Sequence, residues 1–179
     1  MHREHFETID STNAAAARWA ADHPDGVALF TATTQTAGRG QWGRDWQSPP
    51  GGAWFSLVMR RARPDELVSL DAAKAIRDAL SGWVVASRLQ VKPPNDVLLD
   101  HRKVAGILCE QSVRGGDPNH TRPVTLVVGV GVNANVDTAA LQGELRRPPI
   151  SLQEARGATV PIDAVIERCV QTLIARLGS

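Results

Sequence analysis

The chain has 179 residues, a length typical of one domain with a sizeable buried core. Twenty basic residues nearly balance nineteen acidic ones, so the formal net charge of +1 gives no electrostatic argument for binding nucleic acid or an anionic membrane. Two cysteines, Cys109 and Cys169, are too few for a disulfide scaffold, and each lies in an apolar run. The first ten residues lack the apolar core of a signal peptide. We therefore expect a soluble cytoplasmic protein whose thiols are buried and reduced.

The first half of the chain alternates short strands with helices. Residues 5–10 are expected to form a strand, followed by a helix over 14–22 that the side chains of residues 11–13 can cap. A turn at Pro24-Asp25-Gly26 leads to a strand over 27–35, and another strand is expected over 53–60. Residues 65–81 carry apolar side chains at helical spacing, with Pro64 before them and Gly82 after, which predicts a second long helix.

The second half begins with predicted strands over 89–92 and 96–100 on either side of a Pro-Pro-Asn corner. A tight turn at 101–102 leads into a strand over 103–113, and residues 114–120 are expected to be a loop. A strand over 124–136 contains embedded small residues, and Pro161 opens an amphipathic helix that reaches Leu177. Hairpin-like strands interrupted by separated helices predict an α+β fold, with a mixed, largely antiparallel central sheet flanked by helices.

A glycine-rich segment covers residues 37–52, AGRGQWGRDWQSPPGG. Its Gly38-x-Gly40-x-x-Gly43 spacing matches the dinucleotide-binding fingerprint, but prolines and glycines follow where that fingerprint requires a helix. We therefore reject a dinucleotide-binding fold. Glycine N–H groups beside Arg39 and Arg44 could instead clamp an anion, although a solvated loop explains the glycines equally well. The two tryptophans of the segment favour the clamp.

Two further segments contain residues that are unusual for plain strands. In 91–110, Lys92 and Lys103 end neighbouring strands, and Gly106 lies inside a strand, where glycine is costly unless a ligand or another backbone needs the space. In 129–135, Gly129, Gly131, Asn133 and Asn135 occupy alternate positions. Taken alone, solvated edge lysines and a bulge or tight sheet packing would explain these features.

Together these segments resemble the biotin–protein ligase family, which includes the bacterial biotin operon repressor. The matching motifs are, in chain order, Asp10-Ser11-Thr12-Asn13; the run Gln35-x-Ala37-Gly38-Arg39-Gly40-x-x-Gly43-Arg44-x-Trp46-x-Ser48-Pro49-x-Gly51; Lys92-x-Pro94-Asn95-Asp96-Val97 with Lys103-Val104-Ala105-Gly106-Ile107-Leu108-x-Glu110; and Gly129-Val130-Gly131-Val132-Asn133. The resemblance implies a catalytic domain like those of class II aminoacyl-tRNA synthetases and biotin–lipoate ligases. It also implies ATP-dependent formation of biotinyl-5′-adenylate, followed by transfer of biotin to one lysine of a biotin carboxyl carrier protein or domain.

The resemblance also implies roles for individual residues. Lys92 is the leading catalytic candidate, followed by Arg39 and Lys103. The residues implied in binding biotin and ATP are Ser11, Thr12, Gln35, Gly38, Arg39, Gly40, Gln41, Arg44, Asn95, Asp96, Gly106, Gly129, Gly131 and Asn133. Among them, Ser11, Thr12 and Gln35 would bind the ureido head of biotin. Asp96 would bind the Mg²⁺ that accompanies ATP, or orient a lysine.

The chain departs from the family pattern at three points. Gln41 stands where relatives often have an arginine linked to holding the adenylate, and Pro93 stands where the family usually has tryptophan. We also expect a single catalytic domain over 1–179, without the DNA-binding helix-turn-helix and the small C-terminal β-barrel of many relatives. Because of these departures, a non-catalytic biotin-binding module stays an alternative.

Three further questions are left open by the sequence. A lipoate or octanoate ligase-like enzyme is the other alternative function. The sequence does not decide whether the chain forms a homodimer. It also does not identify the residue that stacks on adenine: Trp42 is one candidate, against its interpretation as a hydrophobic anchor of the loop.

Overall fold

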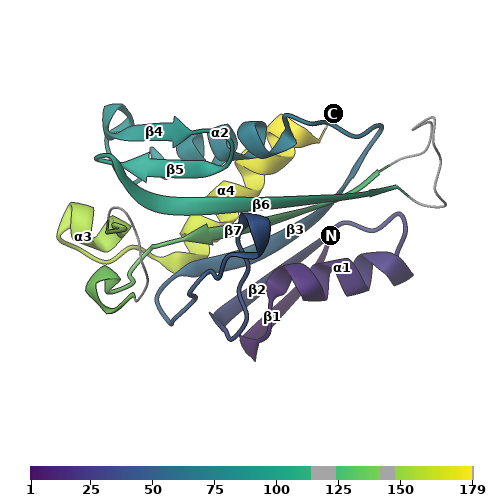
Figure 1. The fold of residues 1–179 in the computed structure, drawn as a ribbon, viewed down its shortest axis with the longest axis horizontal. Coiled ribbons are helices and arrows are strands. Elements are labelled where there is room, and N and C mark those ends of the chain that lie inside the picture. Colours follow the sequence, from purple (N-terminus) through teal and green to yellow (C-terminus); the bar gives the residue numbers. More distant parts are fainter. Residues whose placement is uncertain (114–123, 142–147, 179) are drawn as a thin grey trace.

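A seven-stranded sheet forms the centre of the molecule in the computed structural model, which describes residues 1–113, 124–141 and 148–178 (Figure 1). The strands are β1 (His2–Ile9), β2 (Ala28–Gln35), β3 (Ala53–Arg61), β4 (Leu89–Lys92), β5 (Asp96–Leu99), β6 (Arg102–Val113) and β7 (Val124–Val132). They are ordered β1-β2-β3-β7-β6-β5-β4, and β1 pairs with β2 in parallel while the other neighbours are antiparallel. The predicted mixed, largely antiparallel sheet is confirmed.

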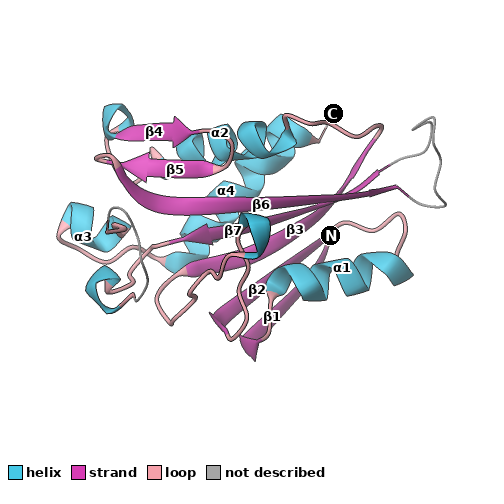
Figure 2. Ribbon diagram, in the orientation of Figure 1, coloured by secondary structure: helices cyan, strands magenta, loops and turns pink. Residues whose placement is uncertain are grey.

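The helices divide between the two faces of this sheet (Figure 2). The long helices α2 (Val68–Leu80) and α4 (Ile162–Leu177) cover one face, and α1 (Thr12–Asp22) lies on the other. A fourth helix, α3 (Leu152–Arg156), lies at one end of the molecule. In the part of the chain that the structure describes, no helix combines the length and apolar character needed to span a bilayer.

Two apolar clusters fill the space between these layers. The larger one joins the inner stripes of α2 and α4 to side chains such as Leu57, Leu126 and Val128 on one face of the sheet. The smaller one lies under α1, where its buried alanines meet Phe30 and Val127 from the other face. Because α1 covers only part of that second face, the remainder is open to a ligand.

The element boundaries agree with the sequence to within two residues except at a few points, one of which is β1, which starts at His2 rather than residue 5. Helix α2 starts at Val68 rather than residue 65, because Asp65 forms a turn in which its side chain accepts from the N–H of Leu67 at 2.9 Å. The β5–β6 turn uses Asp100 and His101, both with left-handed φ, one residue earlier than predicted. Strand β7 ends at Val132 rather than 136, and α3 was not predicted. The predicted loop at 114–120 lies outside the described residues.

The two cysteines differ in exposure. Cys169 is fully buried, as predicted, whereas Cys109 is partly buried against the edge of the larger cluster. Burial raises the pKa of each thiol to about 12. Both thiols are therefore protonated at neutral pH, which makes them poor nucleophiles.

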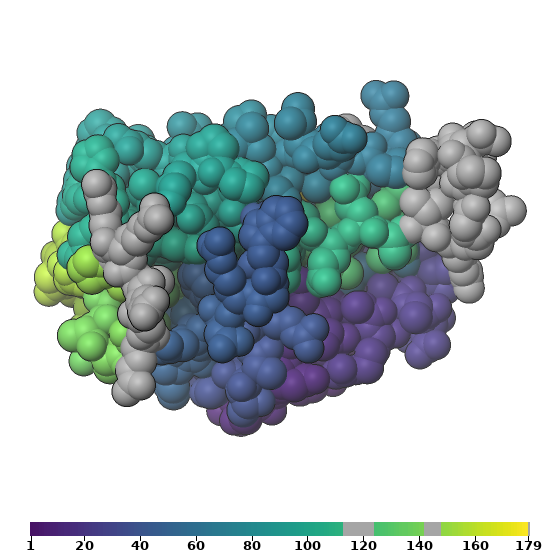
Figure 3. Space-filling view, viewed as in Figure 1, coloured from purple at the N-terminus to yellow at the C-terminus, as the bar shows by residue number. Residues whose placement is uncertain are grey.

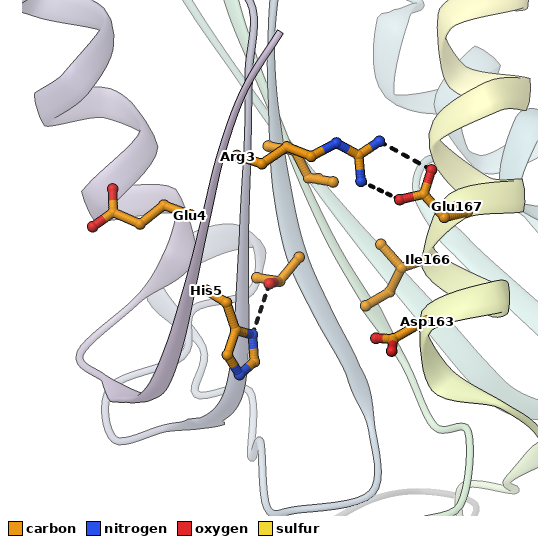
Figure 4. A pocket seen from close by; sticks show the side chains of 8 residues that line it. Arg3, Glu4, His5, Asp163, Ile166 and Glu167 are labelled. Carbon is orange, nitrogen blue, oxygen red and sulfur yellow. Dashed lines mark hydrogen bonds and ion pairs between the residues drawn. The ribbon is translucent and has the colours of Figure 1, made fainter.

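The edge strand β1 is tied to α4 by an ion pair between Arg3 and Glu167 (Figure 4). A small pocket of about 290 Å³ lies beside this pair, with His5 turned toward Thr31 across its rim. The residues that line this pocket include none of the candidate site residues. We interpret it as a packing feature between the sheet edge and the helix.

A second ion pair ties α3 to the start of β6. The guanidinium of Arg102 donates to Glu154 at 2.5 Å, and Thr138 donates to the same carboxylate at 2.9 Å. The hydrogen bond from Arg102 is the main reason that the pKa of Glu154 is lowered. Because the folded-state pKa is lowered, the pair stabilises the fold at neutral pH, and that stabilisation is lost as the pH falls through the folded-state pKa.

Glu154→Gln is therefore expected to reduce the free energy of unfolding at pH 7 by up to about 1 kcal/mol, since the pair is partly exposed and screened by solvent. The difference from the unsubstituted chain should be smaller at about pH 3, because protonation of the carboxylate removes the stabilisation as the pH falls through its lowered folded-state pKa. Urea unfolding at both pH values measures this. Glu66→Gln, at an exposed carboxylate without an ion pair among the described residues, is the matched control. A deficit of equal size at both pH values would show that the charge of Glu154 is not involved.

Candidate active-site cleft

A cleft of about 1170 Å³ opens on the sheet face that carries α1. Figure 3 shows residues near position 40, in blue, standing over the sheet between α1 in purple and the β4–β6 region in teal. The cleft brings together Ser11, Thr12, Gln35, Arg39, Gly40, Gln41, Arg44, Lys92, Asn95, Asp96, Lys103, Gly106, Gly129, Gly131 and Asn133. Segments far apart in the sequence therefore converge on one site. Of the candidate residues, Gly38 is absent from the lining.

The glycine-rich segment forms a short β-hairpin, here called the flap, over Gly38–Trp46. The N–H of Trp46 donates to the carbonyl of Gly38 at 2.9 Å, and the N–H of Gly40 donates to the carbonyl of Arg44 at 2.7 Å. A single 3-10 turn, Gln41–Gly43, closes the tip. A strand returns where a dinucleotide fingerprint would start a helix, which confirms the rejection of that motif.

Gly38 has a structural task in this hairpin. A Cβ at this position would lie 2.4 Å from the backbone oxygen of Trp46 and 2.9 Å from the hydroxyl of Ser48. Any larger residue would push the two arms of the flap apart. Gly38 thus shapes the cleft indirectly, by letting the flap close on itself.

Trp46 was not among the predicted site residues, although it belongs to the glycine-rich motif. Its indole ring covers the floor of the cleft. A Cβ at Gly131 would lie 2.5 Å from the indole nitrogen, and a Cβ at Gly106 would lie 2.9 Å from the ring. A close approach to the backbone was expected at Gly131, and Trp46 makes it. Gly106 was expected to make room for a ligand or another backbone, whereas its neighbours in the structure are the side chains of Trp46 and Lys103. Its indole N–H is buried and has no hydrogen-bond partner among the described residues.

A β-bulge explains why Lys103 and Gly106 both face the cleft. Residues three apart on a regular strand point to opposite faces. The β5–β6 register shifts between Val97 and Leu98, so that Val97 pairs with Ala105 while Leu98 pairs with Lys103. The extra residue on β6 reverses the alternation. A Cβ on Gly106 would consequently lie 3.2 Å from Nζ of Lys103.

The cations of the cleft fall into two groups. Nζ of Lys103 lies 2.7 Å from Oδ1 of Asp96 and 4.9 Å from the centre of a Trp46 ring, so its charge is already paired. Lys92, Arg39 and Arg44 are exposed side chains on the cleft wall, and no ion pair is formed by them within the described residues. These three cations are free to meet an anionic ligand.

Polar side chains at the α1 end form a connected network. Oε1 of Gln35 accepts from the N–H of Thr12 at 2.8 Å and from its hydroxyl at 3.1 Å, while Nε2 of Gln35 donates to Ser48 at 2.7 Å. Gln35 keeps its second amide N–H for a ligand. The Ser11 hydroxyl accepts from the N–H of Ala14 as the helix cap, which leaves its proton free to donate. The α1 end of the cleft therefore presents hydrogen-bond donors.

Three residues behind this network, Asn13, Ser56 and Glu110, were not among the predicted site residues. Ser56 lies 2.8 Å from the Thr12 hydroxyl and 2.5 Å from Oδ1 of Asn13, and Nδ2 of Asn13 donates to Glu110 at 2.8 Å. A Cβ on Gly129 would lie 2.1 Å from Oδ1 of Asn13, so this glycine makes room for the asparagine. The sequence signal was a single serine inside the apolar run of β3.

Two predicted binding residues have structural partners. Nδ2 of Asn95 donates to the carbonyl of Ile107 at 2.7 Å, and Nδ2 of Asn133 donates to the carbonyl of Ile150 at 3.3 Å. Both contacts hold the loops that border the cleft. A direct ligand contact by either residue stays a prediction.

Residues 5–133 match the model of the biotin/lipoate A/B protein ligase family. The chain belongs to this family. It is 40% identical over 158 residues to a biotin–[acetyl-CoA-carboxylase] ligase from Paracoccus denitrificans, covering 84% of this chain and 62% of that protein. It is 30% identical over 170 residues to the bifunctional ligase/repressor BirA of Bacillus subtilis, covering 93% of this chain and 51% of that protein. The chain thus spans between half and two thirds of the length of these relatives.

A solved member of the ligase family confirms the fold. The biotin protein ligase from Aquifex aeolicus in complex with biotin and ATP matches with a TM-score of 0.79 and 25% sequence identity. The match covers 99% of this chain and 70% of that chain. The mixed seven-stranded sheet and its flanking helices therefore match the fold of this biotin protein ligase.

Two of the departures from the ligase motifs lie on the wall of the cleft. Gln41 begins the 3-10 turn of the flap and is half-buried. Pro93 is joined to Pro94 by a cis peptide bond in the corner between β4 and β5. Because Lys92 and Asp96 are opposite each other in the β4–β5 register on either side of this corner, the corner sets the spacing between their backbones.

A metal site built by the protein alone is not seen among the described residues, which contain no group of three histidine, cysteine or acidic side chains placed for it. Mg²⁺ bound to nucleotide phosphates needs only one or two carboxylates. Asp96 fits that requirement if the metal replaces the ammonium of Lys103. In the structure its carboxylate orients Lys103.

Proposed function

We propose that this domain activates biotin with ATP to form biotinyl-5′-adenylate and then transfers biotin to a lysine of a biotin carboxyl carrier protein. The observation that carries this proposal is that one cleft contains both three cations without an ion pair among the described residues, Lys92, Arg39 and Arg44, and a polar end that presents hydrogen-bond donors. The 40% identity to a biotin–[acetyl-CoA-carboxylase] ligase supports the choice of reaction. We expect the reaction to take place in the cytoplasm.

The first step joins two anions. A carboxylate oxygen of biotin attacks the α-phosphorus of ATP, the bond to the β-phosphate oxygen breaks, and pyrophosphate leaves. Negative charge is concentrated between the reactants, so fixed positive groups lower the barrier. Lys92 is the leading residue for this task because its ammonium is free, and Arg39 and Arg44 on the flap would engage the phosphates.

The second step uses the acceptor lysine of the carrier protein as nucleophile. Its neutral amine attacks the acyl carbon, the bond between that carbon and the phosphate oxygen breaks, AMP leaves, and the amine loses a proton to solvent. No covalent bond to this chain is needed. This is consistent with the raised thiol pKa values of Cys109 and Cys169.

Biotin is favoured over lipoate by the polar end of the cleft. The free N–H of Gln35 and the hydroxyl of Ser11 are donors suited to the ureido carbonyl of biotin. The dithiolane ring of lipoate offers no comparable acceptor and would leave these donors unsatisfied, which is costly. We further propose that Mg²⁺ enters with ATP and that Asp96 is its nearest protein ligand.

Incorporation of biotin into a carrier domain tests the proposal. The domain is incubated with biotin, ATP, Mg²⁺ and the unbiotinylated carrier domain of an acetyl-CoA carboxylase, and the carrier mass is measured. We expect one biotin per carrier, dependent on ATP and on the acceptor lysine. Equal incorporation of lipoate would favour the lipoate ligase, and a folded domain that binds biotin without transferring it would identify a binding module.

Gln41→Arg is expected to slow the release of biotinyl-adenylate by about tenfold, because it adds a charged donor on the wall of the cleft beside the expected position of the phosphate. Rapid filtration of the preformed complex measures the release rate. Gln171→Arg, at an exposed position on α4 and therefore on the opposite face of the sheet, controls for the added charge. Unchanged release in Gln41→Arg would mean that residue 41 does not face the ligand.

A further inference from the structure

Trp42 is a large aromatic residue that the proposed chemistry does not use. Its exposed fraction of 89% is the highest among the large hydrophobic residues that the structure describes. It was expected either to anchor the flap or to stack on adenine. The anchor interpretation is wrong, because the side chain lies in solvent and Trp46, four residues later, packs on the cleft floor.

The backbone of the flap holds Trp42 at its tip. Trp42 has φ 62° and Gly43 has φ 72°, both in the left-handed region that tryptophan adopts less readily than glycine or asparagine. The hydrogen bonds between the two arms of the flap close this turn. A bulky residue is therefore displayed outward at a position where a small one would suit the backbone better.

The position of Trp42 relates it to the second substrate of the proposed reaction. Trp42 lies on the rim of the cleft, on the hairpin that also carries the exposed Arg39 and Arg44. A carrier protein must bring its acceptor lysine to this rim for the acyl group to be transferred. Tryptophan and arginine are the residues most enriched among those that dominate protein–protein binding energies.

We propose that Trp42 is a docking residue for the biotin carboxyl carrier domain, packing against an apolar patch beside its acceptor lysine. This inference rests on the proposed function. It separates the flap into a base that serves the small substrates and a tip that serves the protein substrate.

The test compares Trp42→Asn with the unsubstituted domain in both half-reactions. Asparagine accepts the left-handed backbone, so the flap should keep its shape. We expect the KM for the unbiotinylated carrier domain of an acetyl-CoA carboxylase to rise at least tenfold, while biotin-dependent pyrophosphate exchange stays unchanged. Trp42→Phe should restore most of the carrier KM. Val85→Ala removes another exposed apolar residue that does not line the cleft, and it should change neither value.

Direct titration of the carrier domain provides a readout that needs no catalysis. Affinity should fall at least tenfold in Trp42→Asn, so the docking inference can be tested even if the domain proves inactive. Equal carrier affinity in the two proteins would overturn the inference. Slower pyrophosphate exchange would assign Trp42 to the nucleotide instead, and a loss of self-association in sedimentation, with carrier affinity unchanged, would assign it to contact with a second copy.

Discussion

Lys92→Ala is expected to reduce the formation of biotinyl-adenylate by about a thousandfold while leaving the fold intact. Lys92 is exposed and forms no ion pair among the described residues, so its removal leaves no buried charge without a partner. In the proposed reaction it removes a cation from the point where two anions meet, and deleting one such group typically costs a hundredfold to a thousandfold in rate, about 2.7–4 kcal/mol. Biotin-dependent pyrophosphate exchange measures the rate, and urea unfolding measures the stability.

The chain provides a matched control for this experiment. It has only three lysines, and Lys74 lies on α2, away from the cleft, paired with Asp71 at 2.9 Å. Lys74→Ala should retain full exchange. If Lys92→Ala exchanged pyrophosphate at a near-normal rate, the leading role would pass to another cation of the cleft.

Gly131→Ala is expected to displace Trp46 from the cleft floor. The added Cβ would lie 2.5 Å from the indole ring, which is closer than any real contact of that kind. Because the β7 backbone is fixed in the sheet, the ring has to move. Overpacking of this sort costs about 1–3 kcal/mol of stability. Because Trp46 also contacts Lys103, adenylate formation should fall about a hundredfold, as expected for a misplacement of reacting groups by about 1 Å.

Two variants separate the clash from a general effect of adding a methyl group. Gly82→Ala places its Cβ 3.0 Å from the side chain of Arg168, which is flexible and can move, so stability should change little. Trp46→Leu combined with Gly131→Ala removes the clash, and the double variant should be more stable than the sum of the single effects predicts. Strict additivity would show that Gly131 and Trp46 do not touch.

The sequence predicted those parts of the fold that depend on local pattern. The apolar stripes of α2 and α4 and the strands from β2 to β7 were found, because burial on one or both faces sets a readable period. The parallel pairing of β1 with β2 was not predicted, because the tertiary structure decides which strands become neighbours. Helix α3 was not predicted, because this short helix depends on Ser151 as its cap and on the ion pair with Arg102.

The candidate site was likewise predicted where it depends on local motifs and not where it depends on tertiary contacts. The motifs located the cleft residues, and a close approach to the backbone was rightly expected at Gly131. The sequence did not show that this neighbour is Trp46, or that a bulge turns Lys103 toward the same side as Gly106. Both depend on contacts between distant segments.

The central claim, that this cleft joins biotin to ATP, is tested most directly by biotin-dependent exchange of labelled pyrophosphate into ATP. This measurement needs neither a carrier protein nor release of the adenylate. The account predicts exchange that requires biotin, is not supported by lipoate, and is lost in Lys92→Ala. A folded domain that binds both biotin and ATP yet exchanges no pyrophosphate would contradict it.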